Sequence, residues 1–166
     1  MTPGTDCPDE TSLSDLLVGA LAEHRKAQVL AHVEGCAGAP RAALAHCQRA
    51  LALDERAQGA DAPDVAQDLA CLAETHLALG TPEQAVPLLE RARRLHARAP
   101  RDPLDEAWAS FLLARALWEQ RSAEAPTRAT ALAEQARVQL DGLGLRARVE
   151  LRHVLAWQQR PGISLK

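Results

Sequence analysis

Three residues near the N-terminus have the types and spacing of zinc ligands. Cys7 precedes the first predicted helix, and His32 and Cys36 lie four residues apart at the end of the second. Residues four apart lie on the same face of a helix, so this histidine and cysteine could bind one tetrahedral metal ion together with Cys7. The spacing therefore indicates a candidate zinc site with three ligands.

The same residues resemble the zinc finger of anti-sigma factors, in which a cysteine is followed after about 25 residues by His-x3-Cys-x2-Cys. In this chain Ala39 stands where the motif has its last cysteine. Two interpretations stay open: a weak three-ligand site, or a finger that has lost its metal and whose helices pack with the rest of the chain. The missing ligand leads us to expect little or no zinc. The resemblance implies a zinc-dependent transcription regulator of the anti-sigma type as the alternative function.

Sequence motifs that mark common catalytic sites are missing. The chain has no GxSxG, no phosphate-binding GxxxxGK(S/T) and no HExxH. Its 6 histidines and 22 acidic residues are scattered along predicted helices, as is usual for solvated side chains. We therefore predict that the protein is not an enzyme.

The composition predicts an all-α fold. Hydrophobic residues make up 47% of the chain, but aromatic residues only 2%, and tyrosine is absent. Alanine, the best helix former, supplies much of the hydrophobic fraction and lets helices approach one another closely. Residues that favour strands are scarce, which argues against a sheet.

The chain repeats itself with a period of 42 residues. The matching positions at this offset include Leu30-Ala31 with Leu72-Ala73, Gly38 with Gly80, Pro40 with Pro82, and Leu53 with Leu95. A third copy follows, in which Leu113-Ala114 repeats Leu72-Ala73 after 41 residues and Ala129, Ala133 and Ala136 repeat Ala85, Leu89 and Ala92 after 44. In the first two copies a glycine ends the first helix, and in all three a proline opens the second. The small residues of the second helix share one face, where neighbouring helices can pack against them.

These units resemble the tetratricopeptide repeat, in the 42-residue form of kinesin light chains and of the repeat tails of bacterial serine/threonine kinases. The residues that carry the resemblance in the best unit are Leu72, Ala73, Gly80, Ala85, Leu89 and Ala92; His76 stands where the family has a tyrosine. The resemblance implies a right-handed stack of antiparallel helix pairs that binds a protein or peptide on its concave face. It also implies a non-enzymatic module in bacterial signalling or regulation.

The organisation predicted from these patterns has three parts: a degenerate zinc-finger-like segment over residues 1–38, three repeats over 24–140, and a C-terminal capping helix and tail over 141–166. Gly and Pro positions and the apolar period predict the helices. Their expected ranges are 11–20, 23–35, 40–57, 63–79, 82–97, 103–119, 126–140 and 144–159.

The first helices of the repeats line the concave face in the family, and the resemblance assigns the partner-binding residues there. They are Gln67, Cys71 and Glu74 in the middle unit and Trp108, Phe111, Arg115 and Trp118 in the last. Tryptophan and arginine are common anchors of protein interfaces. An alternative interpretation is that the aromatic residues pack beneath the C-terminal helix, because 103–119 is apolar almost all round.

Charge and hydropathy bear on the remaining classes of partner. The net charge is −3, and the basic run from Arg91 to Arg101 has no interleaved aromatic residue, so we expect no nucleic-acid partner. No apolar run is long enough to cross a membrane, and the polar, acidic N-terminus does not resemble a secretory signal. We therefore predict a cytoplasmic protein.

In the cytoplasm we expect the four cysteines to be free thiols or metal ligands rather than disulfides. They are Cys7, Cys36, Cys47 and Cys71.

Overall fold

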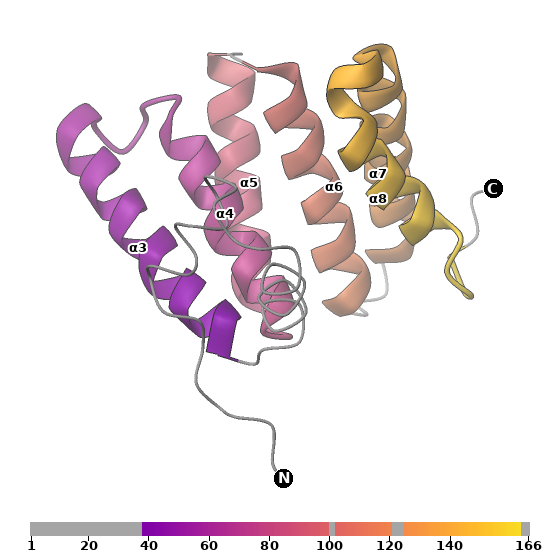
Figure 1. The fold of residues 1–166 in the computed structure, drawn as a ribbon, viewed down its shortest axis with the longest axis horizontal. Coiled ribbons are helices and arrows are strands. Elements are labelled where there is room, and N and C mark those ends of the chain that lie inside the picture. The colour runs from indigo at the N-terminus through magenta and orange to yellow at the C-terminus, as the bar shows by residue number, and fades with distance from the viewer. Residues whose placement is uncertain (1–37, 100–101, 121–124, 164–166) are drawn as a thin grey trace, which may run out of the picture. The chain divides into compact units, whose positions relative to one another are not determined.

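A computed structural model describes residues 38–99, 102–120 and 125–163, and every regular element in these ranges is a helix. The chain divides into two compact units, 1–43 and 44–166, and the description below concerns the second. The helices in chain order are α3 (Gly38–Gln58), α4 (Val65–Ala78), α5 (Pro82–Arg98), α6 (Pro103–Gln120), α7 (Ala125–Gly142), the 3-10 turn η1 (Gly144–Ala147) and α8 (Arg148–Gln158). Figure 1 shows them in this order.

The predicted all-α class is confirmed, and the helix bounds agree with the prediction to within a few residues for α3 to α7. The last element differs, because the predicted helix 144–159 begins as a 3-10 turn and becomes α8 only at Arg148. Gly144 has a φ of 61°, in the left-handed region that interrupts an α-helix. The predicted helices 11–20 and 23–35, and the candidate zinc ligands Cys7, His32 and Cys36, lie outside the described residues.

Consecutive helices pack on one another as antiparallel pairs. Helix α4 packs on α5, α5 on α6, α6 on α7, and α7 on α8. Helix α4 also contacts α6 directly, so the first helices of successive units are neighbours (Figure 1). This is the arrangement that stacked helix-pair repeats require.

The turn between α4 and α5 follows directly from its sequence. Gly80 has a φ of 72°, and the amides of Gly80 and Thr81 donate to the carbonyls of Leu77 and His76 at 3.1 and 2.9 Å. These bonds satisfy carbonyls that the helix end leaves free, as in other glycine-terminated helices. The Thr81 hydroxyl also donates to the His76 carbonyl at 3.0 Å, and Pro82 then opens α5.

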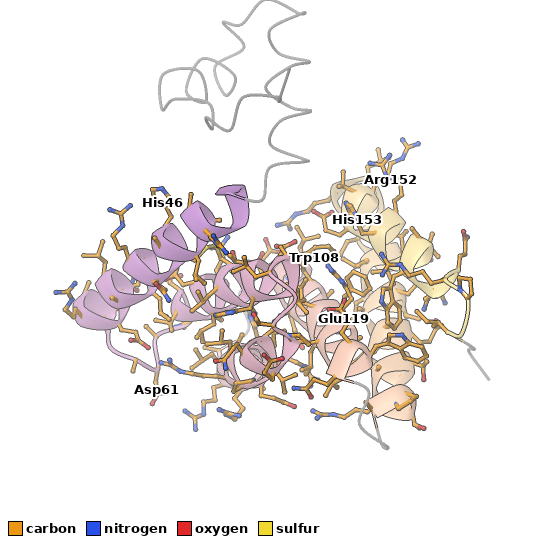
Figure 2. The ribbon with its side chains drawn as sticks, turned by 90° about the horizontal axis from the view of Figure 1, so that it is seen from below. His46, Asp61, Trp108, Glu119, Arg152 and His153 are labelled. Carbon is orange, nitrogen blue, oxygen red and sulfur yellow. A yellow bond between two sulfur atoms is a disulfide. The ribbon has the colours of Figure 1, made fainter. Side chains whose placement is uncertain are left out.

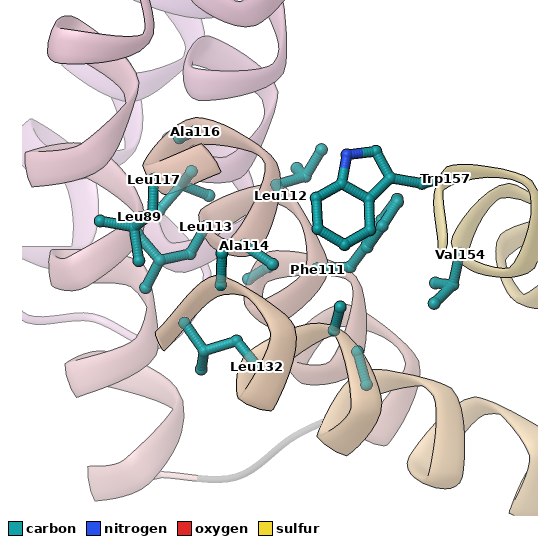
Figure 3. Packing of buried hydrophobic residues seen from close by; sticks show 14 of the residues in the cluster. Leu89, Phe111, Leu112, Leu113, Ala114, Ala116, Leu117, Leu132, Val154 and Trp157 are labelled. Carbon is teal, nitrogen blue, oxygen red and sulfur yellow. The ribbon is translucent and has the colours of Figure 1, made fainter. Parts of the chain in front are cut away.

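Helix α6 is the centre of the core. Its residues Phe111, Leu112, Leu113 and Ala114 are all at most 1% exposed, and side chains of α5, α7 and α8 pack around them (Figure 3). The small residues that the period places on the second helices are fully buried: Ala85 and Ala92 on α5, and Ala129, Ala133 and Ala136 on α7. Short side chains at these positions let the helices approach closely.

Enlarging one of these alanines tests the packing. Ala85 is 0% exposed, and the substitution Ala85→Leu should lower the free energy of unfolding by about 1–3 kcal/mol through overpacking. Urea unfolding followed by circular dichroism measures this change. The control is Ala97→Leu on the same helix, where the side chain is exposed and the cost should be small. Equal stabilities of the two variants would show that Ala85 does not face a packed helix.

Helix α3 departs from the repeat pattern in one respect. Leu95 is 3% exposed, packed with Val65, Ala66 and Leu69 of α4, whereas its equivalent Leu53 is 60% exposed. Leu95 is covered by the first helix of its own unit. The corresponding helix for Leu53 is the one predicted over 23–35, which lies outside the described residues.

A disulfide joins α3 to α4. The sulfur atoms of Cys47 and Cys71 are bonded, with the two Cα atoms 6.0 Å apart. The prediction that these two cysteines are free thiols or metal ligands is therefore wrong. Cys47, which stands 42 residues before the buried Leu89, is itself buried, and it faces the first helix of the next unit at a distance that a disulfide can span.

A pair of carboxyl groups lies on the same seam. Burial raises the pKa of Asp68 in α4 to about 6, and a hydrogen bond with Asp54 of α3 and the charges of Asp54 and Asp64 add to the rise. The second carboxyl oxygen of Asp68, Oδ2, is buried without a hydrogen-bond partner among the described residues. The protonated form of Asp68 therefore fits this seam better than the ionised form.

This raised pKa predicts that stability falls as the pH rises. Between an ordinary aspartate pKa of about 3.9 and the folded-state value, the folded chain holds more protons than the unfolded chain. The free energy of unfolding should thus decrease as the pH rises through this window to about 6. Asp68→Asn, which stays neutral, should raise the melting temperature at pH 7.5 and have little effect at pH 4. The exposed Asp141→Asn serves as control, and equal pH profiles for the two variants would contradict the assignment.

Candidate functional site

Two adjacent pockets lie on the side of the stack formed by the first helices of successive units. The α4–α6 pocket has a volume of about 210 Å³ and is lined by Gln67, Ala70, Cys71, Glu74, His96, Asp105 and Trp108. The α6–α8 pocket has a volume of about 290 Å³ and is lined by Glu74, Trp108, Phe111, Arg115, His153, Trp157 and Arg160. Because Glu74 and Trp108 line both, the two pockets form one groove across α4, α6 and α8.

Six of the seven residues predicted to contact a partner line this groove. Gln67, Cys71, Glu74 and Trp108 surround the first pocket, and Phe111 and Arg115 join Glu74 and Trp108 at the second. The seventh, Trp118, lines neither pocket. Its ring packs edge-on against Trp157, with centroids 5.9 Å apart. Whether these residues bind a partner remains a prediction.

Trp108 lies where the two pockets meet. Its ring centroid is 5.4 Å from that of Phe111 and 5.9 Å from that of His153 on α8 (Figure 2). Trp108 is half-buried, so part of its ring is open to the groove, whereas Phe111 is 1% exposed and lies against Trp157. The alternative that aromatic residues pack beneath the C-terminal helix thus describes Phe111 and Trp118 well, and Trp108 only in part.

The two pockets differ in charge. The α4–α6 pocket holds two carboxyl groups, Glu74 and Asp105, and no lysine or arginine is among its described lining residues. Burial raises the pKa of Asp105, and the charge of Asp102 raises it further, while His96 and Arg146 act in the opposite direction. The α6–α8 pocket shares Glu74 and adds two basic residues, Arg115 and Arg160. A bound segment would therefore meet opposite charges along the groove.

Six lining residues were not predicted from the sequence: Ala70, His96, Asp105, His153, Trp157 and Arg160. Three of them come from the C-terminal part of the chain, which we interpreted only as a cap. A signal for its role was present, because the 41-residue offset that joins Leu72 to Leu113 also joins Leu113 to Val154. This offset makes α8 equivalent to the first helix of another unit, and first helices line the groove.

The basic run on α5 is partly neutralised by acidic residues. Arg91 forms an ion pair with Glu55 at 2.7 Å and donates a hydrogen bond to the Ala60 carbonyl at 2.6 Å, and Arg98 lies 3.6 Å from Asp61. These contacts tie α5 to α3 and to the loop that follows it. They give two arginines of the run a structural role on the outer face of the stack.

Within the described ranges, no group of three or more histidine, cysteine, aspartate or glutamate side chains is arranged to hold a metal ion. Among the helices of these same ranges, none combines the length and the apolar character that crossing a bilayer requires. The zinc prediction concerns Cys7, His32 and Cys36, on which these findings do not bear.

Comparison with known proteins supports the repeat interpretation. A model of the tetratricopeptide repeat family matches residues 23–98, which span α3 to α5 and the predicted helix before them. The third helix pair, α6 and α7, lies beyond the match and is assigned from its own period and packing. No curated protein matches the chain significantly. Tetratricopeptide repeats are protein–protein interaction modules, typically without catalytic activity, so the match over residues 23–98 implies that the partners are proteins.

Proposed function

We propose that the protein binds an extended segment of a partner protein in the groove across α4, α6 and α8. The observation that supports this most directly is the convergence of three first helices on two adjoining pockets that share Glu74 and Trp108. A half-buried tryptophan at the centre of a concave site is a typical interface anchor. The resemblance to the repeat tails of bacterial kinases supports a role in bacterial signalling or regulation.

Arg115 is the second anchor of the proposed site. Its side chain is half-buried in the α6–α8 pocket and has no ion-pair partner among the residues that the structure describes. Holding an unpaired guanidinium in a partly desolvated site costs free energy, which an acidic group of the partner would offset. His153 of α8 and Arg160, which follows α8, lie around the same pocket and favour the same kind of group.

Selection from a random peptide library displayed on phage, with the full chain as bait, tests this proposal. We expect peptides whose affinity, measured by fluorescence anisotropy, falls about tenfold or more in Arg115→Ala and in Trp108→Ala. The matched control is Arg152→Ala, an exposed arginine of α8 that lines neither pocket (Figure 2). If the selected peptides bind all three variants as tightly as the parent chain, they bind elsewhere and the groove assignment is wrong.

A further inference from the structure

His96 on α5 is the most unusual group in the groove. It is 5% exposed, it lines the α4–α6 pocket, and its Nε2 atom is buried without a hydrogen-bond partner among the described residues. Buried polar atoms in folded proteins almost always have a partner, and one without a partner calls for an explanation. A ligand group that enters this pocket and donates a hydrogen bond to Nε2 supplies one.

The charges of the pocket indicate what that group is. Neither Glu74 nor Asp105 has an ion-pair partner within the described ranges, and both carboxyl groups line the same small space as His96. Two unpaired carboxyl groups favour a cation. The half-buried ring of Trp108 forms another wall, and an aromatic face attracts a cation as well.

The shape of the pocket limits the size of the ligand. Its volume of about 210 Å³ lies below the range of about 300–1,000 Å³ that is usual for pockets that hold a whole small-molecule ligand. It therefore suits a single side chain that projects from a longer segment. A lysine or arginine side chain has an alkyl part that can lie along Trp108 and Ala70, and nitrogen donors at its end.

We propose that the α4–α6 pocket is a specificity pocket for a basic side chain of the partner. The cationic end donates hydrogen bonds to the carboxyl groups of Glu74 and Asp105 and to Nε2 of His96. The α6–α8 pocket shares Glu74 but also holds Arg115 and Arg160, whose two positive charges disfavour a cation there. The basic side chain therefore has one place in the groove, which fixes the direction of the bound segment. This inference rests on the proposed function, because the basic side chain belongs to the segment that the groove binds.

Small analogues of the side chains test the pocket directly. We would titrate the full chain with n-propylguanidinium, n-butylammonium and the neutral, isosteric n-propylurea, and follow the imidazole signals of His96 and the indole signal of Trp108 by NMR. Both signals should shift and saturate with at least one cation and stay unchanged with n-propylurea. The response should be lost in the double variant Glu74→Gln, Asp105→Asn and retained in Arg152→Ala.

This titration tests the assignment of the pocket independently of the proposed function. A response to n-propylurea equal to that of the cations overturns the assignment of charge, and no response to either cation overturns the pocket. The difference between the responses to the guanidinium and to the ammonium compound distinguishes arginine from lysine.

The peptides selected on the full chain provide a second test. Replacing their basic residue by norleucine should weaken binding at least tenfold, and Glu74→Gln should abolish this effect of the replacement. Peptides that depend on Arg115 but show no basic preference would refute this inference and leave the proposed function intact.

Discussion

Replacing Phe111 with alanine should lower the free energy of unfolding by about 3–5 kcal/mol. The Phe111 ring is 1% exposed and packs between helices, with its centroid 5.9 Å from that of Trp157 on α8 and 5.4 Å from that of Trp108 (Figure 3). Its removal leaves a cavity between α6 and α8, because the surrounding side chains relax only partly. Urea unfolding followed by circular dichroism and by tryptophan fluorescence measures the loss.

A matched control separates this packing effect from the general cost of removing a large apolar side chain. Leu145 is 85% exposed, and Leu145→Ala should change the stability by less than about 0.5 kcal/mol. In repeat proteins each element is stabilised by its neighbours. In the Phe111→Ala variant, α8 should therefore detach before the rest of the stack unfolds. A loss below about 1 kcal/mol would contradict the packing of α8 on α6.

Reduction of the Cys47–Cys71 disulfide should have the second-largest effect. The bond closes a loop over a sequence separation of 24 residues, and its loss should lower the free energy of unfolding by about 3 kcal/mol. Most of this comes from the greater freedom of the unfolded chain once the cross-link is removed. Urea unfolding with and without a phosphine reductant measures the difference.

The double variant Cys47→Ala, Cys71→Ala is the control, and its stability should not respond to the reductant. Peptide mapping after alkylation without reduction provides a direct check, because neither cysteine should be labelled. Labelling of both residues in the untreated protein would show that the thiols are free, as the sequence had led us to expect.

The helices could be predicted because each unit repeats the same local physics. A Leu-Ala step, a terminating glycine and an opening proline recur with the 42-residue period. Together they determine that α4 ends just before Gly80 and that α5 begins at Pro82. The buried alanines were predictable for the same reason, since spacings of three and four residues place them on one face. Most groove residues of α4 and α6 were assigned by the family resemblance, from equivalent positions on the first helices, whereas Ala70 and Asp105 were not.

The missed features depend on contacts between helices that spacing does not reveal. His96 lies among arginines on α5, and in the sequence it looked like part of a solvated basic run, yet in the fold it is 5% exposed and lines a pocket. The disulfide was missed because the predicted cytoplasmic setting argued against disulfides and because no repeat offset relates Cys47 to Cys71. Only the approach of α3 to α4 brings the two residues together. Trp157 and His153 were missed because the capping helix was not recognised as an equivalent of α4 and α6.

Hydrogen–deuterium exchange of the full chain with and without a selected peptide tests the central claim most directly. If the groove across α4, α6 and α8 is the binding site, the peptide should slow amide exchange in these three helices, while exchange in α5 and α7, apart from the segment around His96, should change little. Binding that protects α5 and α7 and leaves α4, α6 and α8 unchanged would contradict the proposed site.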